Sequence, residues 1–117
     1  MLPPQHRMRR SEDFTDAVRG GARSGTRRLV VHLRTADAAG DPVRVGFVVS
    51  RAVGNAVERN RVKRRLRGLL APRLDDLHDG ERLVVRALPA AAGATSGELA
   101  GDLDTALERA RRRGAGR

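Results

Sequence analysis

The sequence predicts a single α+β domain, a sandwich in which helices pack on a small central sheet in the order αββαβα. Three short segments are rich in valine and leucine, which is typical of strands. Two longer segments repeat apolar residues at helical spacing. A length of 117 residues suits one core and is too short for two. We therefore expect one domain over residues 1–117.

The first predicted element is a short helix over residues 11–19. Ser11 is a favourable N-cap residue, and the acidic Glu12 and Asp13 that follow it suit the positive end of a helix dipole. Two glycines come directly after residue 19, and glycine is the residue most often found just past a helix. The helix is therefore expected to be short.

The next two elements are strands over residues 28–35 and 43–50, with the turn-forming stretch ADAAGDP between them. This arrangement predicts an antiparallel pair. Side chains alternate between the two faces of a strand, so His32 and Arg34 are expected on the face opposite Leu33.

The chain then changes to a helical period. Val62, Leu66 and Leu70 recur one helical turn apart, which predicts a central helix from about residue 56. Pro72 stops this pattern, because proline cannot continue a helix.

The last elements are a strand over residues 82–88 and an amphipathic helix after it. Thr95 and Glu98 form a capping box, which predicts the start of that helix. The helix runs into the basic tail RRRGAGR. We expect this tail, residues 111–117, and the basic start, residues 1–10, to be flexible ends.

The composition is strongly basic: 24 lysines and arginines against 14 acidic residues give a formal net charge of +10 at pH 7. Such an excess predicts a polyanionic partner, either nucleic acid or an acidic membrane surface. Lys63 is the only lysine, and arginine binds phosphate through two parallel hydrogen bonds that lysine cannot make. No apolar run approaches the ~20 residues that span a bilayer, and cysteine is absent. We expect a soluble, cytoplasmic protein with no membrane contact.

The positive charge is densest on the central helix. On a helical wheel the polar side opposite the apolar arc carries Asn60, Arg61, Arg64 and Arg67. Arg59 and Lys63 fall at the edge of the apolar arc, where long side chains can reach water. Only Glu58 offers a compensating charge, whereas an ordinary solvated face mixes both signs. The pattern favours a phosphate-binding surface over a passive solvated one.

The stretch RVGFVVSRAVGNAVERNRVKRRLR, residues 44–67, resembles the signature of the bacterial ribonuclease P protein subunit. That signature runs from a strand ending in serine, through Gly-Asn-Ala, to Arg-Asn-Arg-x-Lys-Arg. The segment RSEDFTDAVRGG is similar to the family's first helix, and the order of elements agrees over nearly the whole chain. The resemblance implies a single RNA-binding domain with a left-handed βαβ crossover, which is rare among proteins.

In that family a large RNA cleaves precursor tRNA to form its mature 5′ end, while the protein binds this RNA and the 5′ leader. The resemblance therefore implies that the isolated protein is inactive, without a catalytic residue or a metal site of its own, and that Mg²⁺ acts with the RNA subunit. The residues it implies for contacts to the catalytic RNA are Arg59, Asn60, Arg61, Lys63, Arg64 and Arg67.

A second implied site is a cleft for the single-stranded leader, between the first helix and one face of the sheet. Its expected members are Phe14, Val18, His32, Arg34, Ser50 and Arg51. Val18 and His32 stand where the family often has aromatic residues, which weakens base stacking worth ~1–3 kcal/mol per base. We expect this cleft to depend more on arginine and backbone contacts.

Other sites and functions receive less support from the sequence. An acidic group after the central helix could suggest a two-metal nuclease, but its turn-like setting without histidine favours a solvated loop. Its members are Asp75, Asp76, Asp79 and Glu81. The three histidines lack the spacing of metal ligands. A structural or ribosome-associated RNA-binding protein is the alternative function. DNA is not an expected partner, because a central helix flanked by strands is not a helix-turn-helix.

Overall fold

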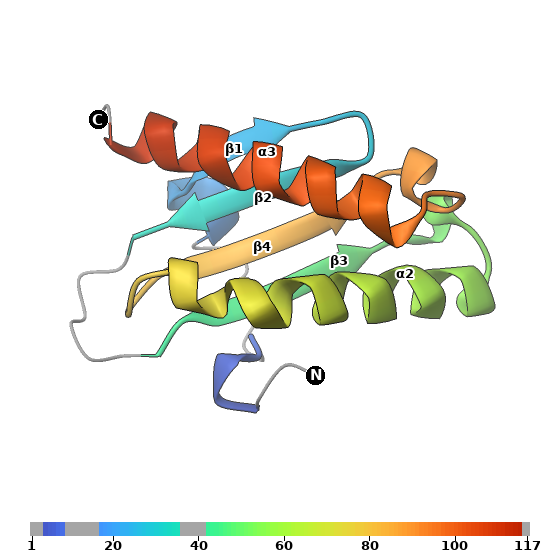
Figure 1. Cartoon of the computed structure of the whole chain (residues 1–117), viewed down its shortest axis with the longest axis horizontal. Coiled ribbons are helices and arrows are strands. Elements are labelled where there is room, and N and C mark those ends of the chain that lie inside the picture. The colour runs from blue at the N-terminus through green and yellow to red at the C-terminus, as the bar shows by residue number, and fades with distance from the viewer. Residues whose placement is uncertain (1–3, 9–16, 36–41, 116–117) are drawn as a thin grey trace.

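The computed structural model describes residues 4–8, 17–35 and 42–115. Four strands form one mixed sheet: β1 (Ala22–Gly25), β2 (Leu29–Arg34), β3 (Arg44–Val49) and β4 (Arg82–Ala87). Their order across the sheet is β1-β2-β4-β3. Two long helices, α2 (Ala56–Leu70) and α3 (Ser96–Ala115), lie side by side on one face of the sheet (Figure 1). The predicted α+β sandwich is confirmed.

The core lies between the sheet and the two long helices. Alternate residues of β2 and β4 point into it, and α2 contributes one side chain per turn. Its fully buried members include Leu29, Val31, Leu83, Val85, Val62, Leu66 and Leu70. At about 2 kcal/mol for each large apolar side chain, burial in this layer supplies most of the driving force that holds the helices to the sheet. The predicted apolar faces of these elements are confirmed.

Both long helices begin where the sequence places a cap. The side chain of Asn55 accepts a hydrogen bond from the backbone N–H of Glu58 at 2.9 Å and so starts α2. At α3, Thr95 Oγ1 accepts from the N–H of Glu98 at 3.1 Å, and Glu98 Oε1 accepts from the N–H of Thr95 at 3.0 Å. The predicted capping box is confirmed.

Three short 3-10 helices lie in the connections of the chain: one before α2, one between α2 and β4, and one after β4. They are η2 (Arg51–Val53), η3 (Ala71–Asp76) and η4 (Pro89–Ala91). The predicted first helix is seen only in its last turn, at residues 17–20. Its earlier part, including Phe14, lies outside the described residues.

The sequence prediction missed β1. The segment Ala22–Gly25 reads ARSG, which has little intrinsic preference for a strand. It is held instead by tertiary contacts, because it pairs antiparallel with β2 and buries Ala22 and Ser24. The observed order is therefore αβββαβα, with one more strand at the edge of the sheet.

The predicted pairing of the second and third strands was also wrong. β2 and β3 are not neighbours, because β4 lies between them, antiparallel to β2 and parallel to β3. The reason is burial: Leu83, Val84 and Val85 of β4 are all at most 1% exposed. A strand that is apolar on both faces gains most in the middle of a sheet, so β4 displaces the local hairpin.

The connection from β3 through α2 to β4 is left-handed. In Figure 1 both strands point to the right, α2 returns in front of them, and β4 lies above β3. Right-handed connections are found in almost all other parallel pairs. The crossover expected from the family resemblance is therefore present.

The outer edge of β3 is covered by the start of the chain. After η1 (Pro4–His6), the N–H of Met8 donates to the carbonyl of Val45 at 2.8 Å. His6 Nδ1 lies 2.7 Å from the carbonyl oxygen of Val43. These contacts occupy backbone groups that an open sheet edge would offer to other chains. At the other end, α3 continues to Ala115. Flexibility of the two basic ends stays a prediction.

Candidate nucleic-acid interface

The outer face of α2 is a rigid basic surface. Val62, Leu66 and Leu70 are completely buried against the sheet, and they fix the rotation of the helix about its axis. The predicted polar set, Asn60, Arg61, Arg64 and Arg67, is exposed on the opposite side. We call these four residues with Arg59 and Lys63 the basic face of α2. Its arginines project from a scaffold that cannot turn them inward.

The two predicted edge residues, Arg59 and Lys63, are half-buried as expected. Arg59 Nε is buried and has no hydrogen-bond partner among the residues that the structure describes. Arg65 differs from its neighbours, because its Nη1 donates to the carbonyl of Ala94 at 2.6 Å. This contact ties α2 to the segment before α3. Arg65 therefore supports the fold, whereas Asn60, Arg61, Arg64 and Arg67 of the basic face are open to solvent.

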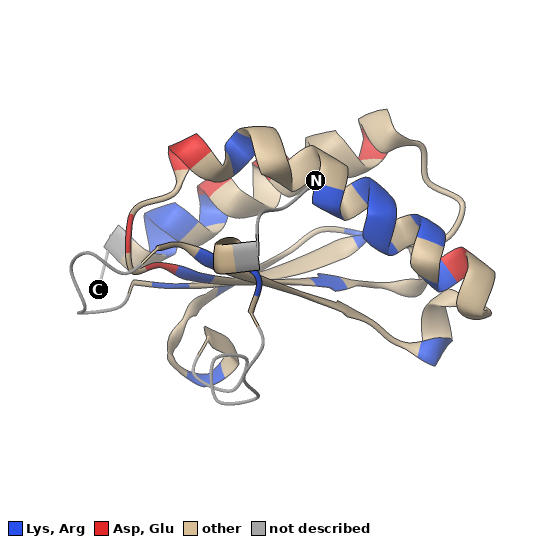
Figure 2. Ribbon diagram, turned by 90° about the horizontal axis from the view of Figure 1, so that it is seen from below, with Lys and Arg blue, Asp and Glu red and all other residues tan. Residues whose placement is uncertain are grey.

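Charge is distributed unevenly over the molecule. Figure 2 shows the basic residues following one another along α2, with one acidic residue, Glu58, in its first turn and further acidic residues on other elements. Within the described part of the chain, no acidic side chain forms an ion pair with Arg61, Arg64 or Arg67. No described helix has the length and apolar character needed to cross a membrane. The basic face thus has the charge that a polyanion would neutralise.

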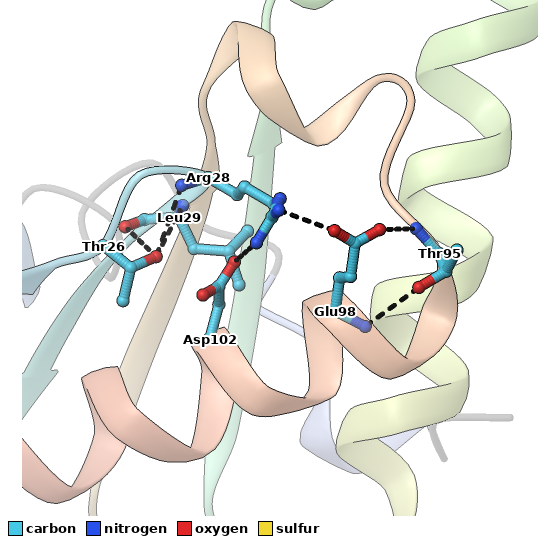
Figure 3. A network of polar contacts seen from close by, with 6 residues as sticks. All are labelled: Thr26, Arg28, Leu29, Thr95, Glu98 and Asp102. Carbon is cyan, nitrogen blue, oxygen red and sulfur yellow. Dashed lines mark hydrogen bonds and ion pairs between the residues drawn. The ribbon is translucent and has the colours of Figure 1, made fainter.

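Three acidic residues of α3 are paired with arginines from other elements. Arg28 donates to Glu98 at 2.7 Å and to Asp102 at 3.0 Å, and so links the β1–β2 turn to α3 (Figure 3). The hydrogen bond to Asp102 is the main cause of the raised pKa of Arg28. Arg73 binds Asp104 at 2.6 Å and lowers the pKa of that carboxyl. These arginines serve the fold.

The acidic group after α2 is not uniformly a solvated loop. Asp75, Asp76 and Asp79 are exposed, but Glu81 is only 1% exposed. Its two oxygens accept hydrogen bonds from Arg111 at 3.0 and 3.1 Å, and Oε1 accepts another from the backbone N–H of His78 at 2.6 Å. The prediction was wrong for Glu81, because its partner comes from the distant end of α3. Glu81 is a structural residue.

The sheet face away from α2 and α3, here called the open face, is also basic, although Met8 and Ala17 pack on Val84 at its middle. Residues paired across neighbouring strands lie on the same face, which puts Arg23 beside His32 and both Arg44 and Arg82 in the row of Arg34. Arg86 adds a fifth arginine, between Val30 and Val48. The four strands contain no acidic residue. Alternation along residues 82–88 could have identified Arg82 and Arg86, whereas Arg23 belongs to the missed strand.

The structure brings some predicted cleft residues together on the open face and separates others. His32 and Arg34 lie on it two residues apart along β2, and Val18 is 46% exposed on the turn of helix above it. Ser50 and Arg51 are exposed just past β3, at the opposite end of the sheet from Arg34. The predicted cleft residues that the structure describes are therefore spread along the length of the strands, and the cleft itself stays a prediction. Phe14 lies outside the described residues.

His32 sits at the centre of the open face and is only 7% exposed. Its Nδ1 has no hydrogen-bond partner within the described segments. Burial lowers the pKa of His32 below its ordinary value of 6.5, and the nearby charges of Arg23 and Arg86 lower it further. The imidazole is therefore neutral at pH 7 and can act as donor on one nitrogen and acceptor on the other.

This lowered pKa gives a stability prediction. Unfolded His32 gains a proton below about pH 6.5, whereas the folded protein resists that proton, so stability falls as the pH decreases from 6.5 through the lowered pKa. We expect the free energy of unfolding, measured in urea, to fall between pH 7 and pH 5. The fall should be smaller in His32→Gln. Equal falls in the two proteins would show that His32 is not the cause of this pH dependence.

Comparison with known proteins gives a consistent match. A family model for ribonuclease P matches residues 2–111. The ribonuclease P protein component of Beutenbergia cavernae is 62% identical over 107 residues, which cover 92% of this chain and 89% of that protein. The protein from Streptomyces bikiniensis is 55% identical, with coverage of 93% and 94%.

Solved structures agree with the sequence relatives. The RNase P protein of Staphylococcus aureus superposes with a TM-score of 0.79 at 25% identity and covers 90% of this chain and 94% of that one. The RNase P protein of Thermotoga maritima gives a TM-score of 0.72 at 24% identity, with coverage of 91% and 96%. The likeness extends over nearly the full length of this chain and of each of these relatives.

Proposed function

This chain belongs to the bacterial ribonuclease P protein family, and we propose that it binds the catalytic RNA of that enzyme and assists the 5′ maturation of tRNA. The observation that carries the proposal is the basic face of α2. It combines dense positive charge, a buried apolar anchor and, among the described residues, no ion-paired acid at Arg61, Arg64 or Arg67. Such a surface suits the phosphate backbone of a folded RNA. We expect the assembly to act in the cytoplasm.

The contacts to the catalytic RNA are assigned to the basic face. Arginine can bind phosphate through two hydrogen bonds, and Asn60 adds a neutral donor and acceptor on the same exposed side. Because α2 is anchored along its whole length, several phosphates can be held without ordering a flexible segment first. That pre-organisation lowers the entropic cost of binding.

The open face is assigned to the 5′ leader of precursor tRNA. It offers arginines from all four strands, a neutral imidazole and no acid within the strands. The arginine guanidinium can contact phosphate and also stack on a base. We therefore propose that arginine and His32 contacts replace part of the aromatic stacking that the family resemblance implies, with Arg34, Ser50, Arg51 and Val18 around them.

Mg²⁺ is assigned to the RNA subunit. A protein site for Mg²⁺ needs carboxylates that converge, and the described residues contain no group of three or more carboxylate, histidine or cysteine side chains suited to an ion. When bound to the RNA, Mg²⁺ supplies the charge that stabilises the attacking and leaving oxygens. The basic face adds fixed positive charge beside that RNA, which lowers the concentration of Mg²⁺ needed for folding and substrate binding.

The experiment that tests this function is reconstitution. The protein alone should not cleave precursor tRNA, the catalytic RNA alone should cleave it slowly at high Mg²⁺, and the two together should be active at low Mg²⁺. Alanine at the exposed Asp75, Asp76 and Asp79 should change this activity by no more than a few fold, because none of these carboxylates takes part in the chemistry. Loss of cleavage in that triple variant, with folding and RNA binding intact, would show that the protein contributes catalytic groups. Glu81 is left unchanged because it supports the fold.

A further inference from the structure

The last turns of α3 lie beside the start of β1, at the free edge of the sheet (Figure 1). Arg113 Nη1 donates a hydrogen bond to the backbone carbonyl of Arg23. That carbonyl therefore points away from β2, towards the outer edge of β1. Arg23 and His32 then form a non-hydrogen-bonded pair, in which the two side chains approach most closely.

Basic and polar groups form a continuous line across the open face to this edge. The line begins at Ser50 and Arg51, past the end of β3, and passes Arg86 on the central strand. Arg86 and Arg23 are both near enough to His32 to lower its pKa. From Arg23 the line reaches Arg113 on α3, so positive charge continues beyond the sheet and around its edge.

Arg113 can still bind a ligand while it holds this carbonyl. A guanidinium has five N–H donors, and the contact to Arg23 uses one of them. The Arg113 side chain is exposed, and no described acidic residue forms an ion pair with it. Arg112, on the next position of the same helix, is instead paired with Glu108. The charge of Arg113 is therefore available to an anionic partner, whereas the charge of Arg112 is already compensated by Glu108.

We propose that Arg23 and Arg113 form a phosphate-binding segment at the β1 edge, which receives leader nucleotides upstream of those lying on the open face. The partner is a single-stranded polynucleotide, because Arg23 and Arg113 extend the row of basic and polar side chains that Arg51, Arg86 and His32 form across successive strands. This inference rests on the proposed function. It adds that the leader continues past the edge of the sheet and contacts the end of α3.

An alternative explanation for Arg113 is purely structural. A cation in the last turn of a helix interacts favourably with the helix dipole, whatever else binds there. That role predicts an effect on stability that is independent of the substrate. A role in leader binding predicts an effect that appears only when the leader is long enough to reach the β1 edge.

The test measures affinity of the reconstituted holoenzyme for precursor tRNAs whose leaders are lengthened one nucleotide at a time. For the unmodified protein, affinity should rise with length and then level off. Arg113→Ala and Arg23→Ala should match it for short leaders and lose roughly fivefold for long ones at about 0.1 M salt, the effect of one phosphate contact to a single strand. Arg113→Lys should recover part of the loss.

Arg112→Ala is the matched control, because it removes the same charge from the same turn of α3. It should follow the unmodified protein at every leader length. Three results would overturn the inference: no gain in affinity with length, an undiminished gain in Arg113→Ala, or an equal loss in Arg112→Ala. Failure of the unmodified holoenzyme to process a precursor with a short leader would instead contradict the proposed function.

Discussion

Replacing Arg61 and Arg64 together with alanine should weaken binding to the catalytic RNA by roughly 25- to 60-fold at about 0.1 M monovalent salt. Both side chains are exposed on the basic face of α2, and neither packs in the core. Each arginine that binds a phosphate displaces a counterion from the RNA, so without these two the slope of log affinity against log salt should fall by about 1.4 to 1.8. Filter binding or fluorescence titration at four or five salt concentrations measures both quantities.

The matched control for this pair is the double variant Arg109→Ala with Arg112→Ala. It removes the same two charges from exposed positions of α3, away from the basic face. Its salt slope for the catalytic RNA should stay within error of the unmodified protein. A slope that falls equally in both double variants would show that net charge, and not the position of the arginines on α2, determines the affinity.

Arg111→Ala should destabilise the protein by about 3 kcal/mol, near the lower end of the range for breaking a buried ion pair. The variant leaves the carboxylate of Glu81, 1% exposed, without the cation that donates two hydrogen bonds to it. The Arg111 side chain is itself 39% exposed, so water that enters after its truncation offsets part of the loss. Urea unfolding followed by far-UV circular dichroism gives the free energy of unfolding.

Two further variants separate this charge effect from simple loss of packing. Arg111→Met combined with Glu81→Gln keeps an acceptor for the N–H of His78 and removes the buried charge, so it should recover more than half of the lost stability. Asp79→Ala removes an exposed acid from the same loop and should cost at most about 0.5 kcal/mol. If the double variant is as unstable as Arg111→Ala, the uncompensated charge of Glu81 is not the main cause of the destabilisation.

Much of this fold could be predicted from local patterns. The period of α2, the alternation in β2 and β3 and the capping box at Thr95 are each set by residues close in sequence, and the structure contains each of them. The basic face of α2 followed from the same period. The prediction that this face binds a polyanion required only the sign of the charge on its exposed side chains.

What could not be predicted depends on distant contacts. Nothing local in ARSG specifies β1, which forms because β2 offers it an edge and the core accepts Ala22. The loop acid Glu81 looks solvated until α3 brings Arg111 to it from 30 residues away. The insertion of β4 between β2 and β3 likewise depends on burial on both faces of one strand, which competes with a local turn. These three errors share one cause, which is long-range packing.

The central place of β4 also constrains how the chain is made. β4 is the last strand to be synthesised, yet it forms hydrogen bonds with both β2 and β3. During vectorial synthesis β2 and β3 must therefore wait, with unpaired edges, until residues 82–87 have emerged. Late pairing of distant segments is slow and exposes a nascent chain to aggregation. Because this protein is so basic, neighbouring nascent chains repel one another, and this repulsion opposes their aggregation until β4 has been synthesised.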